Sequence, residues 1–260
     1  MDIEIYNLSE VTSTNDYARE LLNQNNLVLV SALNQTEGRG RKGNNWFGSY
    51  GKNLYISFGI KHQNTISPNQ LASLQAMSAL IVKKALRTVT NSDTFYIKYP
   101  NDIYAKDANG FKKIAGILLE HNFSGSVCIN TIIGIGINVL EDNFPIELAN
   151  NATSLKMLNL VGDNKNNLLK PENSISEIQN GLIDYFNLYF NIFANGDTIH
   201  IFNEWKEELN IIGKEAFILE KGQYFEIIEL LDDCRLRAYS KTNNEEIIID
   251  NGNSIRYKLD

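Results

Sequence analysis

The chain has 260 residues, a formal net charge of −7 and a pI near 5.1. Its hydrophobic fraction of 43% is ordinary for a globular protein, and its length allows one sizeable domain plus a small one. The acidic balance argues against broad nucleic-acid binding. The sequence contains no signal-peptide pattern and no apolar run of membrane-spanning length. We therefore expect a cytoplasmic protein that acts on neither nucleic acid nor membranes.

The spacing of the two cysteines argues against a cysteine-based metal site and against a disulfide-stabilised fold. Cys128 and Cys234 stand far apart and form neither a metal-binding spacing nor a disulfide framework. We expect both to be small packing residues in a reducing compartment.

Hydrophobic periodicity and helix-start signals predict alternating strands and helices in the first 210 residues. Ser13 to Asn15 offer helix caps, and Ser67-Pro68 is a strong helix start. In chain order, we expect a strand at 3–8, a helix at 16–22, strands at 27–33 and 53–60, a helix at 68–87, strands at 95–99, 102–105, 113–120 and 126–138, and helices at 175–193 and 197–208. The Asn-rich stretches 143–151 and 163–174 are predicted loops.

The pattern changes after Gly213, where short β-rich runs are separated by turn residues. We expect strands at 215–219, 224–231, 234–239 and 245–249. Short strands at this spacing are typical of a small closed or nearly closed sheet. The sequence thus predicts an α+β fold: a mixed β-sheet flanked by helices over residues 1–210, and a small β-barrel domain over residues 211–260.

The most informative segment is the Gly-Arg loop, defined here as residues 38–46. It contains three glycines and three cations in an acidic chain. Glycines allow the backbone to approach a ligand closely, and Arg39 and Arg41 add forked donors for phosphate or carboxylate. The pattern predicts a loop that closes over an anionic ligand, although a solvated basic loop would have the same composition.

The same letters satisfy the glycine pattern of dinucleotide-binding folds. That pattern must open a helix, since the pyrophosphate sits on the helix N-terminus. The residues after Gly43 are poor helix formers and lead into another strand. Asn44 also stands where a Walker loop needs lysine. Both interpretations are therefore disfavoured.

Three further clusters carry chemistry. Lys98 to Tyr104 place an Asn-Asp pair on a turn, and Lys113 opens the apolar run 113–120. A lysine at a buried strand start needs an anionic partner, whereas one at a strand edge could extend to water. Gly116 inside a strand indicates that a ligand or another backbone approaches closely. The segment 134–138 also has glycines inside a strand, which indicates another close approach, and it ends at the side-chain amide of Asn138. Tight packing within the sheet would explain its glycines equally well.

In this order, the motifs Ser13-Thr14-Asn15, Gln35, 38–46, 98–104, 113–120 and 134–138 closely resemble those of biotin–protein ligases, also called biotin–[acetyl-CoA-carboxylase] ligases. The motif resemblance covers about residues 10–140, and the tail resembles the family's SH3-type domain. The resemblance implies a class II synthetase-like catalytic fold, with ATP and biotin as substrates and Mg²⁺ accompanying ATP. It implies formation of biotinyl-5′-AMP and transfer of biotin to a lysine of a biotin carboxyl carrier domain.

The resemblance also implies roles for individual residues. Biotin binding falls to Ser13, Thr14, Asn15, Gln35, Arg39, Gly40, Arg41, Lys113 and Gly116. The nucleotide side comprises Lys98, Asn101, Asp102, Asn138 and Arg41. Catalysis is expected to depend on the cations Lys113, Arg39 and Arg41, with Asp102 as the group that accepts a proton from the acceptor amine or orients it. The metal ligands remain unassigned.

Two positions depart from the family pattern. Asn44 stands where arginine is usual, which puts one phosphate contact in doubt, and Tyr99 replaces a tryptophan. Only about ten residues precede Ser13, so we expect the monofunctional type, without a DNA-binding domain or repressor activity. The family includes monomers and dimers, which leaves a homodimer open.

Two alternatives belong to other functional classes. A lipoate or octanoate ligase or transferase would share the fold, but the Gly-Arg loop argues against it. A non-enzymatic biotin- or adenylate-binding module is opposed by the retained Lys113 and loop arginines.

Overall fold

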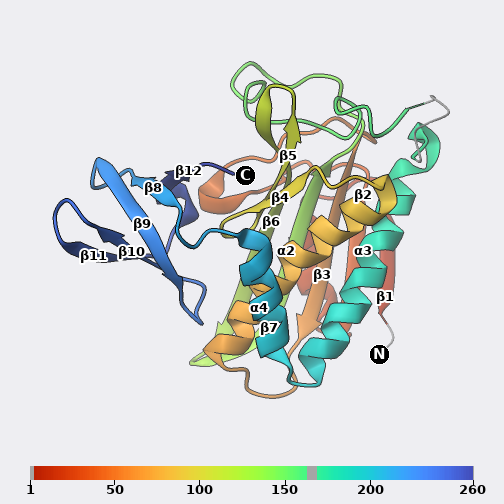
Figure 1. The fold of residues 1–260 in the computed structure, drawn as a ribbon. Coiled ribbons are helices and arrows are strands. Elements are labelled where there is room, and N and C mark those ends of the chain that lie inside the picture. The colour runs from red at the N-terminus through yellow and green to blue at the C-terminus, as the bar shows by residue number, and fades with distance from the viewer. Residues whose placement is uncertain (1–2, 163–168, 260) are drawn as a thin grey trace.

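The computed structural model describes residues 3–162 and 169–259 and contains two β-sheets (Figure 1). The first is a seven-stranded mixed sheet with the order β1-β2-β3-β7-β6-β5-β4. Its strands are β1 (Glu4–Leu8), β2 (Leu27–Ala32), β3 (Asn53–Lys61), β4 (Phe95–Lys98), β5 (Asp102–Asp107), β6 (Gly110–Ser124) and β7 (Val127–Asn138). Among these seven strands, all within the described ranges, only β1 and β2 pair in parallel.

Helices cover both faces of this sheet. On one face lie α2 (Pro68–Thr90), α3 (Pro171–Ala194) and α4 (Thr198–Leu209), which share a core with Leu27, Leu29 and Phe58. On the other face α1 (Thr14–Leu21) buries Ala18 against Val28 and Val30. Alternate residues of β2 thus serve two cores, which explains why the whole strand is buried and mostly apolar.

Helix starts follow the capping signals in the sequence. The Ser13 hydroxyl accepts a hydrogen bond from the Asp16 N–H at the start of α1. Ser67 and Gln70 form a capping box at the start of α2, with proline at the first position. The predicted loop 163–174 is wrong in its last residues, because α3 begins at Pro171, where the fixed φ of proline suits a first turn. Residues 163–168 lie outside the described residues.

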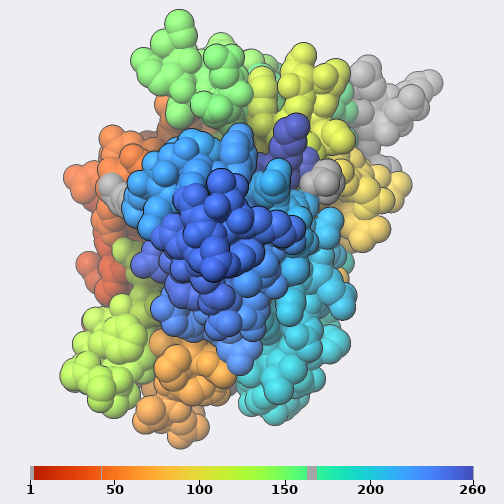
Figure 2. Space-filling view, turned by 60° about the vertical axis from the view of Figure 1, so that its left-hand side comes forward, coloured from red at the N-terminus to blue at the C-terminus, as the bar shows by residue number. Residues whose placement is uncertain are grey.

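The second sheet is antiparallel, with the order β11-β10-β9-β8-β12. It comprises β8 (Glu215–Ile218), β9 (Gln223–Leu230), β10 (Leu236–Ser240), β11 (Glu245–Ile249) and β12 (Ile255–Tyr257). The sequence did not predict β12, which is only three residues long. In Figure 2 this sheet, in blue, forms a compact mass that faces the viewer, and Figure 1 shows it to the left of the first sheet. Its closure into a barrel, and a domain boundary near residue 210, stay predictions.

The C-terminal sheet is tied to the turn that precedes Asp102. The Tyr257 hydroxyl accepts a hydrogen bond from the Tyr99 N–H at 2.7 Å, and the Tyr99 hydroxyl donates to the Cys234 carbonyl at 2.8 Å. Gly252 packs against the same turn, since a Cβ there would lie 2.5 Å from the Tyr99 carbonyl oxygen. One hydrophobic cluster runs from the first sheet into the second. The C-terminal part of the chain therefore holds the turn before Asp102 in place.

Both cysteines are buried and unpaired, as expected of packing residues. Among the described residues, no helix is long and apolar enough to cross a membrane.

We predict that Tyr257→Phe lowers the free energy of unfolding by about 1–3 kcal/mol, because the Tyr99 N–H would lose its acceptor inside the protein. Urea unfolding would measure the change. Tyr224→Phe, at a tyrosine that is 61% exposed, is the matched control. Equal stability of both variants would show that the link contributes nothing.

Two histidines at the first sheet contact the same hydroxyl group, that of Thr131. His62 Nε2 and His121 Nδ1 lie 2.8 and 2.9 Å from Thr131 Oγ1. Burial, together with the nearby His121, lowers the pKa of His62 from its usual 6.5 to about 4. Burial also lowers the pKa of His121. The folded state therefore favours neutral imidazoles here.

This arrangement predicts an acid-sensitive stability. Between pH 6.5 and about 4 the unfolded chain binds a proton at His62 that the folded chain does not, so stability falls as the pH is lowered. Because His62 is only partly buried, the loss attributable to it is on the order of 1–3 kcal/mol. Urea unfolding at pH 7 and pH 4.5 should show a smaller loss for His62→Gln than for His200→Gln, which changes an exposed histidine. Identical losses would contradict the assignment.

Candidate active site

One register row across the first sheet brings the predicted motifs together. Lys98 pairs with Asp102, Asp102 with Gly116, Gly116 with Gly136, and Gly136 with Tyr55. Five strands thus place residues from three of the predicted motifs side by side, next to Tyr55. The antiparallel register explains why motifs distant in sequence share one site.

The Trp46 indole lies on the two central glycines of this row. A Cβ at Gly116 would lie 2.5 Å from Trp46 Cζ3, and one at Gly136 would lie 2.6 Å from Cε2. The sequence predicted a ligand or another backbone near Gly116. In the structure the Trp46 side chain makes this close approach, and the approach of a ligand to Gly116, which also lines the cavity described next, stays a prediction. The Gly-Arg loop therefore rests on the sheet through Trp46.

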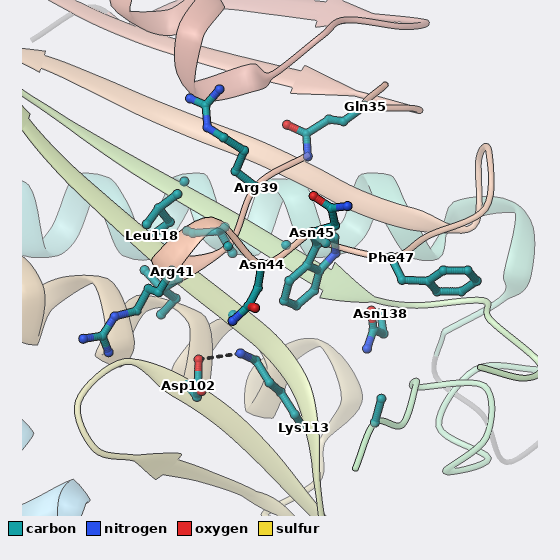
Figure 3. Close-up of a pocket in the computed structure, with 18 of the residues that line it drawn as sticks. Gln35, Arg39, Arg41, Asn44, Asn45, Phe47, Asp102, Lys113, Leu118 and Asn138 are labelled. Carbon is teal, nitrogen blue, oxygen red and sulfur yellow. Dashed lines mark ion pairs between the residues drawn. The ribbon is translucent and has the colours of Figure 1, made fainter. Parts of the chain in front are cut away.

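A cavity of about 510 Å³ opens between the Gly-Arg loop and the sheet (Figure 3). It takes in most of the residues that the sequence selected. The predicted residues in its lining are Ser13, Thr14, Asn15, Gln35, Arg39, Gly40, Arg41, Asp102, Lys113, Gly116 and Asn138.

The structure places the other two predicted residues, Lys98 and Asn101, outside this lining. Lys98 Nζ lies 3.4 Å from the hydroxyl of Tyr104, which does line the cavity. Burial lowers the pKa of Lys98. The buried Asn101 donates to the Ile117 carbonyl at 2.7 Å and accepts from Arg41 at 3.1 Å. Both therefore reach the cavity only through a neighbour.

One end of the cavity is polar and uncharged. Gln35 Oε1 accepts hydrogen bonds from the N–H and the hydroxyl of Thr14, at 2.8 and 3.0 Å. The buried Ser57 hydroxyl lies 2.8 Å from Thr14 Oγ1 and 2.6 Å from Asn15 Oδ1. Hydroxyl and amide groups at the start of α1 are thereby held in fixed orientations toward the loop.

Charged residues border this polar end. Arg39 makes two hydrogen bonds of 2.7 Å to Asp16, while Arg19 contacts Asp16 and Glu120. Glu120 also accepts from the Asn15 amide at 2.7 Å. The Arg39 guanidinium holds the pKa of Asp16 below its usual value. Carboxylates thus balance the charge of Arg39 in this structure.

The opposite side of the cavity holds an ion pair. Lys113 Nζ lies 2.7 Å from Asp102 Oδ1 and 5.5 Å from the Trp46 ring centroid. Figure 3 shows this pair across the loop from Gln35 and Arg39, with Asn44 pointing toward it. The predicted start of the strand at Lys113 is wrong, because β6 begins at Gly110 and pairs with β5 there.

A wall that the sequence did not predict comes from the segment 144–153. The N–H of Lys113 donates to the Asn151 carbonyl at 2.8 Å, and the N–H of Thr153 donates to the Lys113 carbonyl at 2.9 Å. Phe144, Leu148, Asn151 and Ala152 consequently line the cavity. The Asn-rich composition predicted a loop here but gave no signal for its partner.

Within the described part of the chain, two buried polar atoms in the lining have no hydrogen-bond partner: Asn138 Oδ1 and Trp46 Nε1. The Asn138 amide nitrogen donates to the Thr153 carbonyl at 2.9 Å, which fixes the side chain. One acceptor and one donor are thus available to a ligand. Asn253, from the C-terminal sheet region, also lines the cavity, and nothing in the sequence pattern indicated this.

The comparisons with known proteins identify the family to which this fold and cavity belong. The model of the biotin/lipoate A/B protein ligase family matches residues 8–138. The chain belongs to this family.

Individual relatives are similar to parts of the chain. A bifunctional ligase/repressor BirA of Bacillus spizizenii is 37% identical over 149 residues, which cover 56% of this chain and 44% of that protein. A biotin–[acetyl-CoA-carboxylase] ligase of Mycobacterium tuberculosis is 30% identical over 145 residues, 54% of this chain and 49% of that protein. The matched region thus spans less than half of each relative.

A solved structure extends the likeness over the whole fold. The biotin protein ligase of Aquifex aeolicus, in complex with biotin and ATP, aligns with a TM-score of 0.73 and covers 99% of both chains. Its sequence identity is 24%, so the likeness shows a shared fold.

We predict that Gly134→Ala lowers stability by about 1–3 kcal/mol and displaces Asn15, because a Cβ there would overlap the Asn15 side chain. Asn15→Ala in the same background removes the overlapping atoms. A double-mutant cycle of urea unfolding should therefore show favourable coupling between the two changes. Simple additivity of the two effects would contradict this packing.

Proposed function

We propose that the protein is an ATP-dependent biotin–protein ligase, an enzyme that forms a C–N bond. It would activate biotin as biotinyl-5′-AMP and transfer it to a lysine of a biotin carboxyl carrier domain. Family membership supports ligation, and the relatives named above support biotin as the acid.

The observation that carries the choice of biotin is the polar end of the cavity. Ser13, Thr14, Asn15 and Gln35 offer hydroxyl and amide groups there. The urea of biotin has one acceptor and two donors, which such groups match. The dithiolane of lipoate has no N–H or carbonyl group, so it could not pair with the donors and acceptors that these residues still have free after their mutual hydrogen bonds. This end therefore favours biotin over lipoate.

The first step needs electrostatic assistance rather than a base. A carboxylate with an ordinary pKa is ionised at neutral pH, so its attack on the α-phosphate is opposed mainly by charge repulsion. Lys113 has three N–H donors and directs one to Asp102, which leaves two for the acid and the phosphate. Arg41, with a single hydrogen bond to Asn101, is a second cation at the cavity.

Mg²⁺ would enter as part of the nucleotide substrate. In the described ranges 3–162 and 169–259, no group of three His, Cys, Asp or Glu side chains is arranged to hold a metal. The phosphate oxygens would therefore supply most of its ligands, and the ion would reduce their repulsion toward the incoming carboxylate.

The second step requires a neutral amine. A free lysine has a pKa near 10.4, so the acceptor must lose a proton before it attacks the mixed anhydride. Asp102 lines the cavity beside Lys113 and is our candidate for accepting or directing that proton. The nitrogen then bonds to the acyl carbon while AMP leaves with the bonding electrons.

We predict that Lys113→Ala lowers the rate of biotinyl-5′-AMP formation by about a thousandfold, because it removes a cation that the proposed mechanism places at the developing charge. Lys112→Ala is the matched control, since Lys112 contacts the Ala149 carbonyl and lies outside the cavity lining. Radiolabelled ATP and chromatographic separation of the adenylate would measure the rate.

Near-normal adenylate formation by folded Lys113→Ala would remove Lys113 from the mechanism. Adenylate formation by neither the natural protein nor the control, in samples that bind biotin, would instead support a binding module.

A further inference from the structure

Glu141 is a buried carboxylate that the proposed chemistry does not use. It lies three residues beyond the end of β7 and is 2% exposed. Burying an ionisable group requires compensating hydrogen bonds. The Glu141 carboxylate must therefore have hydrogen-bond donors close to it.

The carboxylate accepts three hydrogen bonds from residues around the start of β3. Glu141 Oε1 accepts from the Ser49 N–H at 2.6 Å and from the Asn53 amide at 2.8 Å, and Oε2 accepts from the Ser49 hydroxyl at 3.1 Å. Two of the three donors belong to Ser49, which lies three residues after Trp46. The hydrogen bonds of the Glu141 carboxylate thus fix the chain just beyond the Gly-Arg loop.

Close packing against β3 also holds this segment in place. A Cβ at Gly48 would overlap the Tyr55 hydroxyl and the Asn53 amide, so the chain leaving the loop lies directly on β3. The side-chain oxygen Oδ1 of Asn53 in turn accepts a hydrogen bond from the Val139 N–H at 3.2 Å. These contacts join the end of the loop to the end of β7, the strand that contains Gly136 and Asn138.

We propose that Glu141 is a positioning residue for the Gly-Arg loop. By fixing Ser49, it holds the returning end of the loop against the sheet, so that Trp46 stays on Gly116 and Gly136 and the cavity stays covered. Glu141 acts through Ser49 and does not line the cavity.

The proposal distinguishes hydrogen-bonding capacity from charge. A glutamine at position 141 has one oxygen for the two nitrogen donors and an amide that can donate to the Ser49 hydroxyl. Glu141→Gln should therefore retain the anchor, whereas Glu141→Ala should lose it. Asp142→Asn is the matched control, because its exposed neighbouring carboxylate pairs with Lys52 and Lys156.

The test is amide hydrogen exchange in the ligand-free protein, read on peptides that cover residues 38–52. Glu141→Ala should raise exchange there by about tenfold, since the Ser49 N–H loses a charged acceptor. Peptides from α3 should be unchanged. Glu141→Gln and Asp142→Asn should stay within about twofold of the natural protein. Unchanged exchange in folded Glu141→Ala would overturn the proposal.

If Glu141→Ala does not fold, Glu141→Asp provides a second test. Glu141→Asp keeps the charge but shortens the side chain by one methylene, so it should withdraw from Ser49 and give the same local increase in exchange. A uniform increase over all peptides, with no excess at 38–52, would assign Glu141 to general stability and overturn the positioning role.

A second measurement rests on the proposed function. Glu141→Ala should release its adenylate about tenfold faster than Glu141→Gln, because a loosened loop covers the cavity less completely. Equal release would contradict this consequence. If the natural protein forms no adenylate, the proposed function fails, while the exchange experiment still decides the role of Glu141.

Discussion

The contact of the Trp46 indole with the bare backbone of β6 and β7 is the constraint on which the site depends. The register of five strands places Gly116 beside Gly136, and the absence of two side chains creates the surface that receives the ring. The Gly-Arg loop is thereby brought over the sheet. Arg41 then reaches Asn101, and Lys113 Nζ lies over the same ring. A cavity forms because a loop and a sheet meet through one large side chain.

Charge balance gives the cavity two different sides. Around Arg39, the carboxylates of Asp16 and Glu120 offset the guanidinium groups and leave a neutral, hydrogen-bonding environment next to Thr14. Around Lys113, one carboxylate faces a lysine that keeps free donors, with Arg41 close to the same cavity. An uncharged polar head group suits the first side, and an acid with a phosphate suits the second. In a chain of net charge −7, this local arrangement matters more than the overall balance.

The sequence predicted the strands and helices well wherever periodicity or capping was strong, as at Ser67-Pro68 and in the apolar run of β2. It missed β12, whose three residues are too few for a period, and the role of segment 144–153, whose position depends on backbone bonds to Lys113. Short motifs identified most of the cavity lining because glycine and arginine patterns are local. The contributions of Asn253 and Tyr257 depend on tertiary packing, which no local pattern encodes.

The most direct test of the account is exchange of labelled pyrophosphate into ATP, with biotin or lipoate as the acid and no acceptor protein present. Because the polar side of the cavity matches a urea, the account predicts exchange that depends on biotin and not on lipoate. This result would show reversible adenylation and name its substrate. Exchange that depends on lipoate instead, or the absence of exchange in a folded sample that binds biotin, would contradict the account.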